Sequence, residues 1–455
     1  MSPHAVIPSR EAMFQEDDLL GTFSISQNAF LPGKPPLRVL PNSYYTPWES
    51  LMDQLPDLIK RREIRERISQ LPILTTDNLH TEHEWRRAYV ILAFFTHAYI
   101  WGNDTPAEIL PPPITVPLLA VSKHLDLPPV ATYAALNLWN WTVTTPHASA
   151  SPGDLSLDSL SACHTFTGTE SESWFYMVSV AMEAQAGSLI PTILAALRAI
   201  PVHDHATITS ALAALAACIR TTSSLLTRMH EKCDPAVFYH DIRPFLAGSK
   251  NMAHAGLPRG IFYDVGEGKG AWRQLRGGSN GQSSLIQFFD VVLGVVHASG
   301  GHSSPHAPAP AEGPQGKEVT GSFHVELRDF MPGPHRRFLE HVGRMGSLRN
   351  FALQEGGGED QRRCREAYRD AVAALTDMRD GHLKIVTRYI VVPSRSPHTG
   401  RERNLASVSS HSPGAAVGEK EDAELTGTGG TALLPFLKQS RQETAEAAKL
   451  GSLGA

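Results

Sequence analysis

The sequence predicts an all-α protein. Apolar residues recur at helical spacings along most of the chain, and strand-like alternation is scarce. No internal repeat with a period of roughly 20–50 residues appears, which argues against a solenoid. The chain has 455 residues, of which 42% are apolar, and this is enough to fill a sizeable core. We therefore expect a globular helical protein.

Long runs with apolar residues three and four positions apart mark the clearest helices. Five stand out: Glu82–Trp101, Glu172–Leu197, Ala206–Lys232, Ser284–His297 and Gln361–Val391. Helices are expected to be shorter in the first third of the chain, because the prolines at Pro111–Pro113 and Pro128–Pro129 interrupt it. This contrast predicts a small N-terminal helical domain at residues 1–130 and a large C-terminal helical domain at residues 131–455.

Two segments break the helical pattern. Ala298–Thr320 is rich in Gly, Pro, Ser and His, and Ser394–Thr426 is polar and follows a proline. Segments of this composition bury little apolar surface. We expect mobile loops near residues 298–320 and 394–426.

Composition excludes several classes of protein. A net charge of −5 without any Lys/Arg-rich run argues against nucleic acid as a partner. The N-terminus has early acids and no apolar signal core, and the best membrane candidate, Ala211–Ile219, is short of the roughly 20 residues required. Four cysteines form no zinc spacing and are expected to be reduced thiols. We expect a cytoplasmic protein, not bound to a membrane, that acts as a monomer.

His382 is the first candidate for chemistry. Val372, Leu375, Met378, His382 and Val386 are spaced by three or four residues, so one imidazole lies within an apolar helical stripe. Such a histidine is often a core residue whose nitrogens are satisfied by neighbours. It can also be the axial ligand of a haem, with its second ring nitrogen held by an acceptor. Spacing alone leaves both interpretations open.

Asp290 is the second candidate, because apolar residues flank it in SLIQFFDVVLGVV. A carboxylate in that setting either faces solvent or needs a cation. Arg379, one turn before His382, is a possible partner, and the pair would join two helices. A solvent-facing Asp290 remains the alternative.

Other features are individually weak. The turn Arg276–Ser284, RGGSNGQSS, leads into a helix N-terminus that favours an anion, but it lacks the nucleotide-binding signatures and would suit a carboxylate. Phe175 and Ser179 share one helical face, which ordinary packing also explains. Pro244 disfavours helical geometry at Arg243, so Arg243 is expected at a helix end or kink.

Taken together, separated motifs resemble the indoleamine 2,3-dioxygenase family. The resemblance covers roughly residues 51–436 and is strongest in four segments: GGSNGQSS at Gly277–Ser284, FFDVVLG at Phe288–Gly294, HLKIVTRYI at His382–Ile390 and GTGGT at Gly427–Thr431. Earlier matches include LPDLI, RERI, AYIWG and LDLPP. The family resemblance implies a helical protein with haem b as its cofactor.

The resemblance assigns the cofactor site as follows. It implies that His382 is the proximal ligand of the haem iron, with the Arg379–Asp290 ion pair beside it. Ser279 would lie at the haem edge. The substrates implied are L-tryptophan, or a related indoleamine, and O₂.

It also implies where substrate binds. In the family's pattern Phe238 packs on the indole, Arg243 binds the carboxylate, and Thr428 belongs to a loop that closes over the amino acid. The related tryptophan 2,3-dioxygenases have a distal histidine where Ser179 stands, which favours the indoleamine branch. The full implied set is Tyr133, Phe175, Ser179, Phe238, Arg243, Ser279 and Thr428.

The reaction implied is insertion of both atoms of O₂ across the C2–C3 bond of the indole, giving N-formylkynurenine in the kynurenine pathway of tryptophan catabolism. Three departures concern substrate affinity and turnover more than reaction class: Tyr176, Asn280 and a longer Ala298–Thr320 segment. A haem-binding sensor or carrier without turnover, a dioxygenase of other indoleamines and a helical interaction protein without cofactor are the alternatives.

Overall fold

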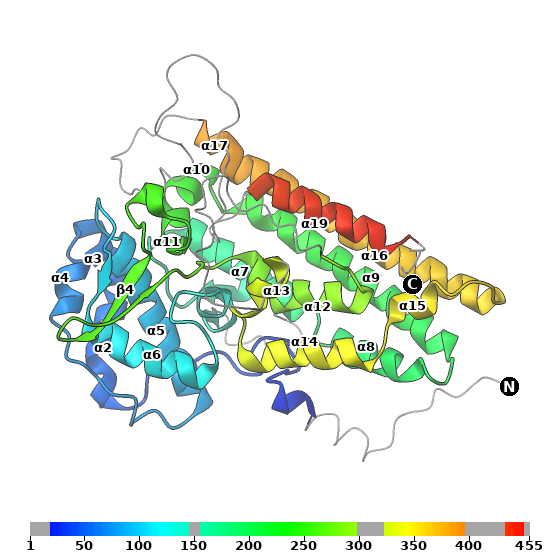
Figure 1. Ribbon diagram of the computed structural model, residues 1–455, viewed down its shortest axis with the longest axis horizontal. Helices are drawn as coiled ribbons and strands as arrows, with labels where there is room; N and C mark the ends of the chain where they lie inside the picture. The colour runs from blue at the N-terminus through cyan, green and yellow to red at the C-terminus, as the bar shows by residue number, and fades with distance from the viewer. Residues whose placement is uncertain (1–18, 145–154, 298–322, 396–432, 450–455) are drawn as a thin grey trace, which may run out of the picture.

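The computed structural model describes residues 19–144, 155–297, 323–395 and 433–449. Most of the two predicted loops, and Thr428 with its GTGGT motif, lie outside these residues. Within them the protein is mainly helical, with shorter helices on one side and long helices on the other (Figure 1).

In the part of the fold that begins the chain, the described helices have 14 residues or fewer apart from α5, which has 20. They are α2 (Thr46–Asp53), α3 (Leu55–Arg61), α4 (Ile64–Ser69), α5 (Glu82–Trp101) and α6 (Pro112–Leu125). Helix α5 has the predicted bounds because Thr81 caps it in a capping box with Glu84. Its residues from Ala88 to Phe95 are all buried, so α5 is the central helix of this part.

Five short strands correct the all-α prediction to a mainly helical fold. Strand β1 (Ile109–Leu110) pairs parallel with β4 (Ile261–Gly266), which pairs antiparallel with β5 (Lys269–Arg273). A second pair joins β2 (Trp141–Val143) to β3 (Leu160–Ala162). The central pairing joins strands far apart along the chain, and strands this short leave little alternation to detect in the sequence.

The single helix expected at Glu172–Leu197 is two helices, α7 (Glu170–Ala184) and α8 (Leu189–Ala199). Between them, a Cβ on Gly187 would lie 2.2 Å from the carbonyl oxygen of Gln27. The N-terminal segment therefore packs directly against the backbone at the break, and only glycine permits that approach.

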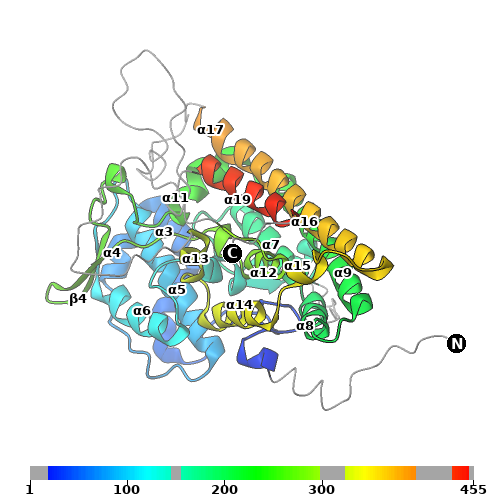
Figure 2. The same ribbon diagram turned by 45° about the vertical axis from the view of Figure 1, so that its right-hand side comes forward.

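Three long helices lie side by side (Figures 1 and 2): α9 (His205–Thr227), α16 (Glu359–Val386) and α19 (Leu433–Ala447). Helix α9 ends in the 3₁₀ turn η4 (Arg228–Glu231). The expected helix Ser284–His297 is shorter, because α12 (Ser284–Leu293) ends at Gly294, whose φ of 62° is left-handed. The remaining α-helices are α10 (Pro235–Val237), α11 (Arg243–Leu246), α13 (Phe323–Arg328), α14 (Gly333–Met345), α15 (Leu348–Ala352) and α17 (Val392–Ser394).

Two apolar clusters make up the core. One runs from Leu31 to Tyr263 and takes in Ile385 and Tyr389, so it extends across the predicted boundary at residue 130. The other joins the N-terminal segment to α8, α9, α12, α14 and α16. The proposed domain boundary stays a prediction.

The expectation that no segment is long enough to span a membrane was wrong. Glu170–Ala199 and His205–Glu231 are long and apolar enough by length and composition. In the fold each contributes residues to the buried clusters, as the core helices of globular proteins do. Length and hydropathy therefore do not distinguish these two stretches from ordinary core helices.

Candidate active site

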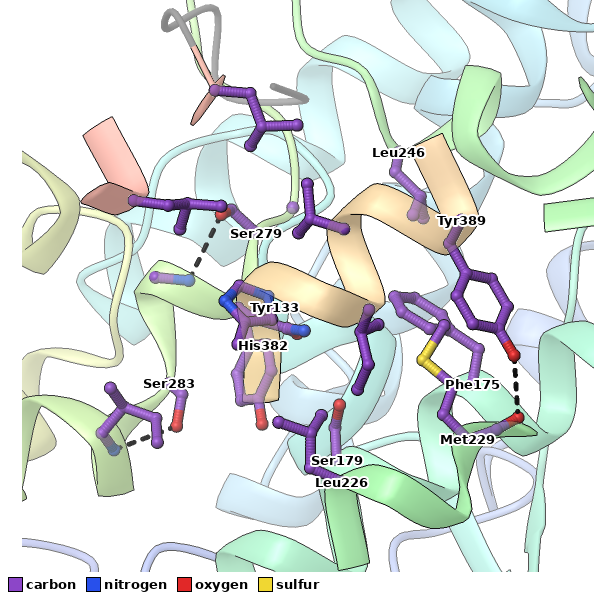
Figure 3. Close-up of a pocket in the computed structure, with 18 of the residues that line it drawn as sticks. Tyr133, Phe175, Ser179, Leu226, Met229, Leu246, Ser279, Ser283, His382 and Tyr389 are labelled. Atoms are coloured by element: carbon purple, nitrogen blue, oxygen red, sulfur yellow. Dashed lines mark hydrogen bonds between the residues drawn. The ribbon is translucent and has the colours of Figure 1, made fainter. Parts of the chain in front are cut away.

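A cavity of about 240 Å³ lies between α7, α16 and the turn that precedes α12 (Figure 3). In the same measure one water needs only about 10–15 Å³, so this is a ligand-sized space rather than a packing defect. Eight residues predicted for the site line it: Tyr133, Phe175, Ser179, Phe238, Arg243, Ser279, Arg379 and His382. Asp290 lies behind Arg379, and Thr428 is outside the described residues.

Three π-helical segments of the described chain contribute to the cavity wall. They are η2 (Ala134–Leu138), η5 (Phe238–Ile242) and η8 (Thr387–Val391). The wider π turn is rare and occurs frequently at functional sites. Their shared location marks this cavity as the functional centre of the fold.

His382 points its imidazole into the cavity from α16 (Figure 3). Among the described residues neither ring nitrogen has a hydrogen-bond partner, so the acceptor expected for the second nitrogen is not found there. Burial, together with the charge of Arg379, lowers the pKa of His382 to about 4. The imidazole is therefore neutral at physiological pH, which is the form that binds a metal.

The predicted ion pair between α12 and α16 is present. The guanidinium of Arg379 donates to both carboxylate oxygens of Asp290, at 2.7 and 2.8 Å, and Asp290 is only 2% exposed. Arg379 also donates to the carbonyl of Ser440 and the hydroxyl of Thr444, both at 2.6 Å. Arg379, one turn before His382, thus links α12, α16 and α19 at one point.

Two stacked histidines extend this network. The Nδ1 atom of His297 lies 2.6 Å from Oε2 of Glu443, and its Nε2 lies 3.2 Å from Oδ2 of Asp290. His324 stacks on His297 with ring centroids 3.5 Å apart and bonds to Ser440. Asp290, His297 and His324 are metal-ligating residue types, but the in-plane lone pairs of nearly parallel rings do not converge on one ion. The cluster is a polar link between α12, α13 and α19.

An aromatic wall stands on the other side of the cavity. Phe238 packs against Phe175, with centroids 4.9 Å apart, and against the edge of Tyr389 at 5.8 Å. The Tyr389 hydroxyl donates to the carbonyl of Cys233 at 2.8 Å, which fixes the ring. These rings form an aromatic wall against which a flat aromatic ligand can pack.

Arg243 provides the cation beside this wall. It is the first residue of α11, at the junction with η5, and its side chain is 4% exposed. Its position at a helix junction was predicted, although its backbone is helical despite Pro244. Burial lowers its pKa, and the guanidinium lies 5.4 Å from the ring of Tyr239. A buried arginine that lines a cavity can pair with a carboxylate.

The glycine-rich turn forms another edge. Ser279 lines the cavity and its Oγ accepts from the N–H of Gly281 at 3.2 Å (Figure 3). A Cβ on Gly277 would lie 2.0 Å from the carbonyl oxygen of Leu246, so close backbone packing explains this glycine without any phosphate. Asn280, one of the departures, also lines the cavity.

The departure at Tyr176 does not reach the cavity. Its ring is fully buried, and its hydroxyl donates to Oε1 of Glu172 at 2.8 Å. The residue does not line the cavity, so the extra hydroxyl is accommodated inside the protein.

Several residues at the site were missed from the sequence. Helix α19 lies beyond the motifs and contributes Leu433, Phe436, Leu437 and Ser440 to the lining. The pattern LLPF followed by LKQS places these residues on one helical face, which is the signal that could have revealed them. Others missed include the lining residues His324, Tyr389 and Ser283, and Glu183, a carboxylate behind the lining.

The sequence profile of indoleamine 2,3-dioxygenase matches residues 19–447. The chain belongs to the indoleamine 2,3-dioxygenase family. It is 39% identical over 434 residues to the indoleamine 2,3-dioxygenase nanC of Aspergillus nanangensis, covering 95% of this chain and 97% of that protein. The indoleamine 2,3-dioxygenase of Saccharomyces cerevisiae is 40% identical over 433 residues, covering 93% and 92%. The 6-hydroxytryptophan 2,3-dioxygenase fscD of Fusarium equiseti is 36% identical over 418 residues, covering 92% and 94%.

This indoleamine 2,3-dioxygenase family member is therefore an enzyme of a haem-dependent dioxygenase family. The cavity fits the group. It presents a neutral histidine on a long helix, and its lining is otherwise largely apolar, as haem sites in helical proteins are. His382 is the residue that would hold the iron, and Arg379 with Asp290 would fix the turn of α16 that carries it.

Proposed function

We propose that this enzyme cleaves the C2–C3 bond of the indole ring of L-tryptophan with O₂, giving N-formylkynurenine, and that haem b held by His382 is its cofactor. One observation supports this most strongly. A single cavity brings together a neutral histidine, a wall of aromatic rings and a buried arginine. These are the groups needed for iron, indole and carboxylate respectively.

The haem, when bound, supplies the activation of dioxygen. The protein holds the substrate and excludes water. Phe238, fixed between Phe175 and Tyr389, offers its face to the indole. Arg243 has a planar pair of donors that matches the substrate carboxylate, and this charge-assisted contact is strong because the site is buried. Thr428, outside the described residues, is proposed to contact the amino-acid end from its loop.

Two alternatives differ in substrate use. The relative from Fusarium equiseti is named for 6-hydroxytryptophan, so a ring-substituted tryptophan is a second candidate substrate. The second alternative is a haem carrier without turnover, which would not need a buried arginine beside an aromatic wall. Arg243 lines the cavity at 4% exposure, which favours the enzyme that binds an amino acid.

Arg243→Ala tests substrate binding, with Arg259→Ala as control because Arg259 lies outside the cavity with its side chain 65% exposed. Loss of a buried charged partner should raise the KM for L-tryptophan on the order of a hundredfold. The resting haem spectrum should not change. Product formation is followed by the ultraviolet absorbance of N-formylkynurenine. An unchanged KM in Arg243→Ala would mean that the carboxylate is held elsewhere, and faster turnover of 6-hydroxytryptophan would favour the second substrate.

A further inference from the structure

Glu183 is a fully buried carboxylate on the helix that lines the cavity. It lies four residues after Ser179 and eight after Phe175, so all three occupy one face of α7. Within the described residues no ion pair includes Glu183. A buried carboxylate without a cation is expensive, which calls for another source of stabilisation.

Neutral donors supply it. The Ser283 hydroxyl donates to Oε1 of Glu183 at 2.5 Å, and the backbone N–H of Leu285 donates to Oε2 at 3.2 Å. The hydroxyl of Tyr133 and the backbone of Ser284 lie close to this carboxylate and lower its pKa. Burial nevertheless raises the pKa of Glu183 to about 7. Every partner is a donor, so the carboxyl group acts as an acceptor for several segments at once.

Those segments are the ones that form the cavity wall. Tyr133, Ser179 and Ser283 all line the cavity, as His382 does (Figure 3). The backbone N–H of Tyr133 donates to Oε1 of Gln282 at 2.9 Å, which ties this tyrosine to the turn before α12. Glu183 thus joins α7 to the same turn, through Ser283 and Leu285.

We propose that Glu183 is the positioning residue of this wall, and that its carboxylate fixes Ser283 and the turn that holds Tyr133, so that the wall keeps one shape around bound ligands. The inference rests on the proposed function for its kinetic part. Glu183 does not line the cavity and touches no ligand, so it acts only through its partners. A glutamine of the same shape replaces one acceptor oxygen with a donor, leaving at least one of these donors unpaired.

The same helix provides a matched control. Glu172 is also fully buried, and burial raises its pKa as well. Its carboxylate accepts from the N–H groups of Phe166 and Thr167 at 2.8 and 2.7 Å and from the Tyr176 hydroxyl. None of these four residues lines the cavity. Glu172→Gln therefore removes a buried carboxylate of α7 without touching the wall.

The experiment compares Glu183→Gln with Glu172→Gln in the haem-loaded protein. Three readouts are taken: the kcat and KM for L-tryptophan, the C–O stretching frequency of carbon monoxide bound to the ferrous haem, and amide hydrogen exchange across residues 279–286. Losing one buried hydrogen bond at the wall should lower kcat/KM about tenfold, chiefly through kcat. The stretching frequency should shift and exchange should accelerate, whereas Glu172→Gln should change none of the three.

Ser283→Ala removes the donor of the shortest of these hydrogen bonds. It replaces Glu183→Gln in the comparison if that variant does not fold. Its effects should match those of Glu183→Gln, and the double variant should be no worse than either single variant. Identical stretching frequency and exchange in Glu183→Gln, Ser283→Ala and wild type would overturn the proposal. If no variant and no wild-type sample forms product, the proposed function fails, while the other two readouts still decide whether Glu183 shapes the wall.

Discussion

Helix α12 meets two buried carboxylates beside the cavity. Asp290, within α12, accepts two hydrogen bonds from Arg379, one turn before His382. Glu183, from α7, accepts hydrogen bonds only from neutral donors at the N-terminus of α12. Burial alone would raise both pKa values. Arg379 and His297 hold the pKa of Asp290 well below its usual range, whereas that of Glu183 rises to about 7.

The difference shows that a fixed cation, not burial, decides how each carboxylate behaves. Asp290 keeps its charge over the whole physiological range and ties the helix of His382 in place. Glu183 changes its protonation near neutrality, because hydroxyl and amide dipoles compensate burial only in part. Asp290 therefore stays ionised across that range, whereas the charge of Glu183 changes with pH.

Removing His382, one turn after Arg379 of the ion pair, should have the largest effect. His382→Ala should abolish stable haem binding, since a single axial histidine holds the iron in such sites. His324→Ala is the control, because His324 also lines the cavity but bonds to Ser440 and stacks on His297. The Soret absorbance per protein reports both. A full, unshifted haem spectrum in His382→Ala would show that the iron is held elsewhere.

The ion pair comes next. Asp290→Asn or Arg379→Gln should each lower the free energy of unfolding by about 3–5 kcal/mol, because each leaves a buried charge without its partner. The double variant should lose much less than the sum of the two. Urea titrations of all four proteins measure this coupling. Additive losses would mean that the two side chains do not stabilise each other, even though a guanidinium nitrogen of Arg379 lies 2.7 Å from Oδ1 of Asp290.

The pH dependence of stability tests the difference between Glu183 and Asp290. The pKa of Glu183 is raised in the fold, so its contribution to stability is complete below about pH 4.5 and is lost as pH rises through about 7. The stability of wild type relative to Glu183→Gln should fall by on the order of 3 kcal/mol between about pH 5 and pH 8. The contribution of Asp290 is present above its ordinary pKa and is lost only at lower pH, so wild type relative to Asp290→Asn should stay constant. If both stability differences changed with pH in the same way, the distinction between Glu183 and Asp290 would be wrong.

The smallest effect is expected for Tyr176→Phe. The hydroxyl of Tyr176 donates to Glu172 inside the protein, away from the cavity. Its removal should cost about 1 kcal/mol of unfolding free energy and leave the KM for L-tryptophan unchanged. A changed KM at equal stability would show that this departure reaches the substrate after all.

Much of the site could be predicted because its parts carry local or motif-level signals. The bounds of α5 follow from a capping box at Thr81, and the ion pair follows from Asp290 and Arg379 each needing a partner in apolar surroundings. His382 stood in an apolar stripe, but only the family motif favoured a ligand over a core histidine.

The remainder depends on contacts between distant segments. Helices α7 and α8 separate at Gly187 because the N-terminal segment packs there at Gln27. Glu183 looks like an ordinary helical glutamate until the fold brings Ser283 to it from 100 residues away. The pairing of β1 with β4 is equally non-local. Periodicity describes each element alone, so it cannot reveal which elements meet.

The most direct test of the central claim uses labelled dioxygen. Ferrous, haem-loaded wild type is given L-tryptophan under ¹⁸O₂, and the product is analysed by mass spectrometry. A dioxygenase whose cavity holds iron at His382 and the amino acid at Arg243 should form N-formylkynurenine carrying two labelled oxygen atoms, and His382→Ala should form none. Product with one labelled atom, or labelled product from His382→Ala, would contradict the account.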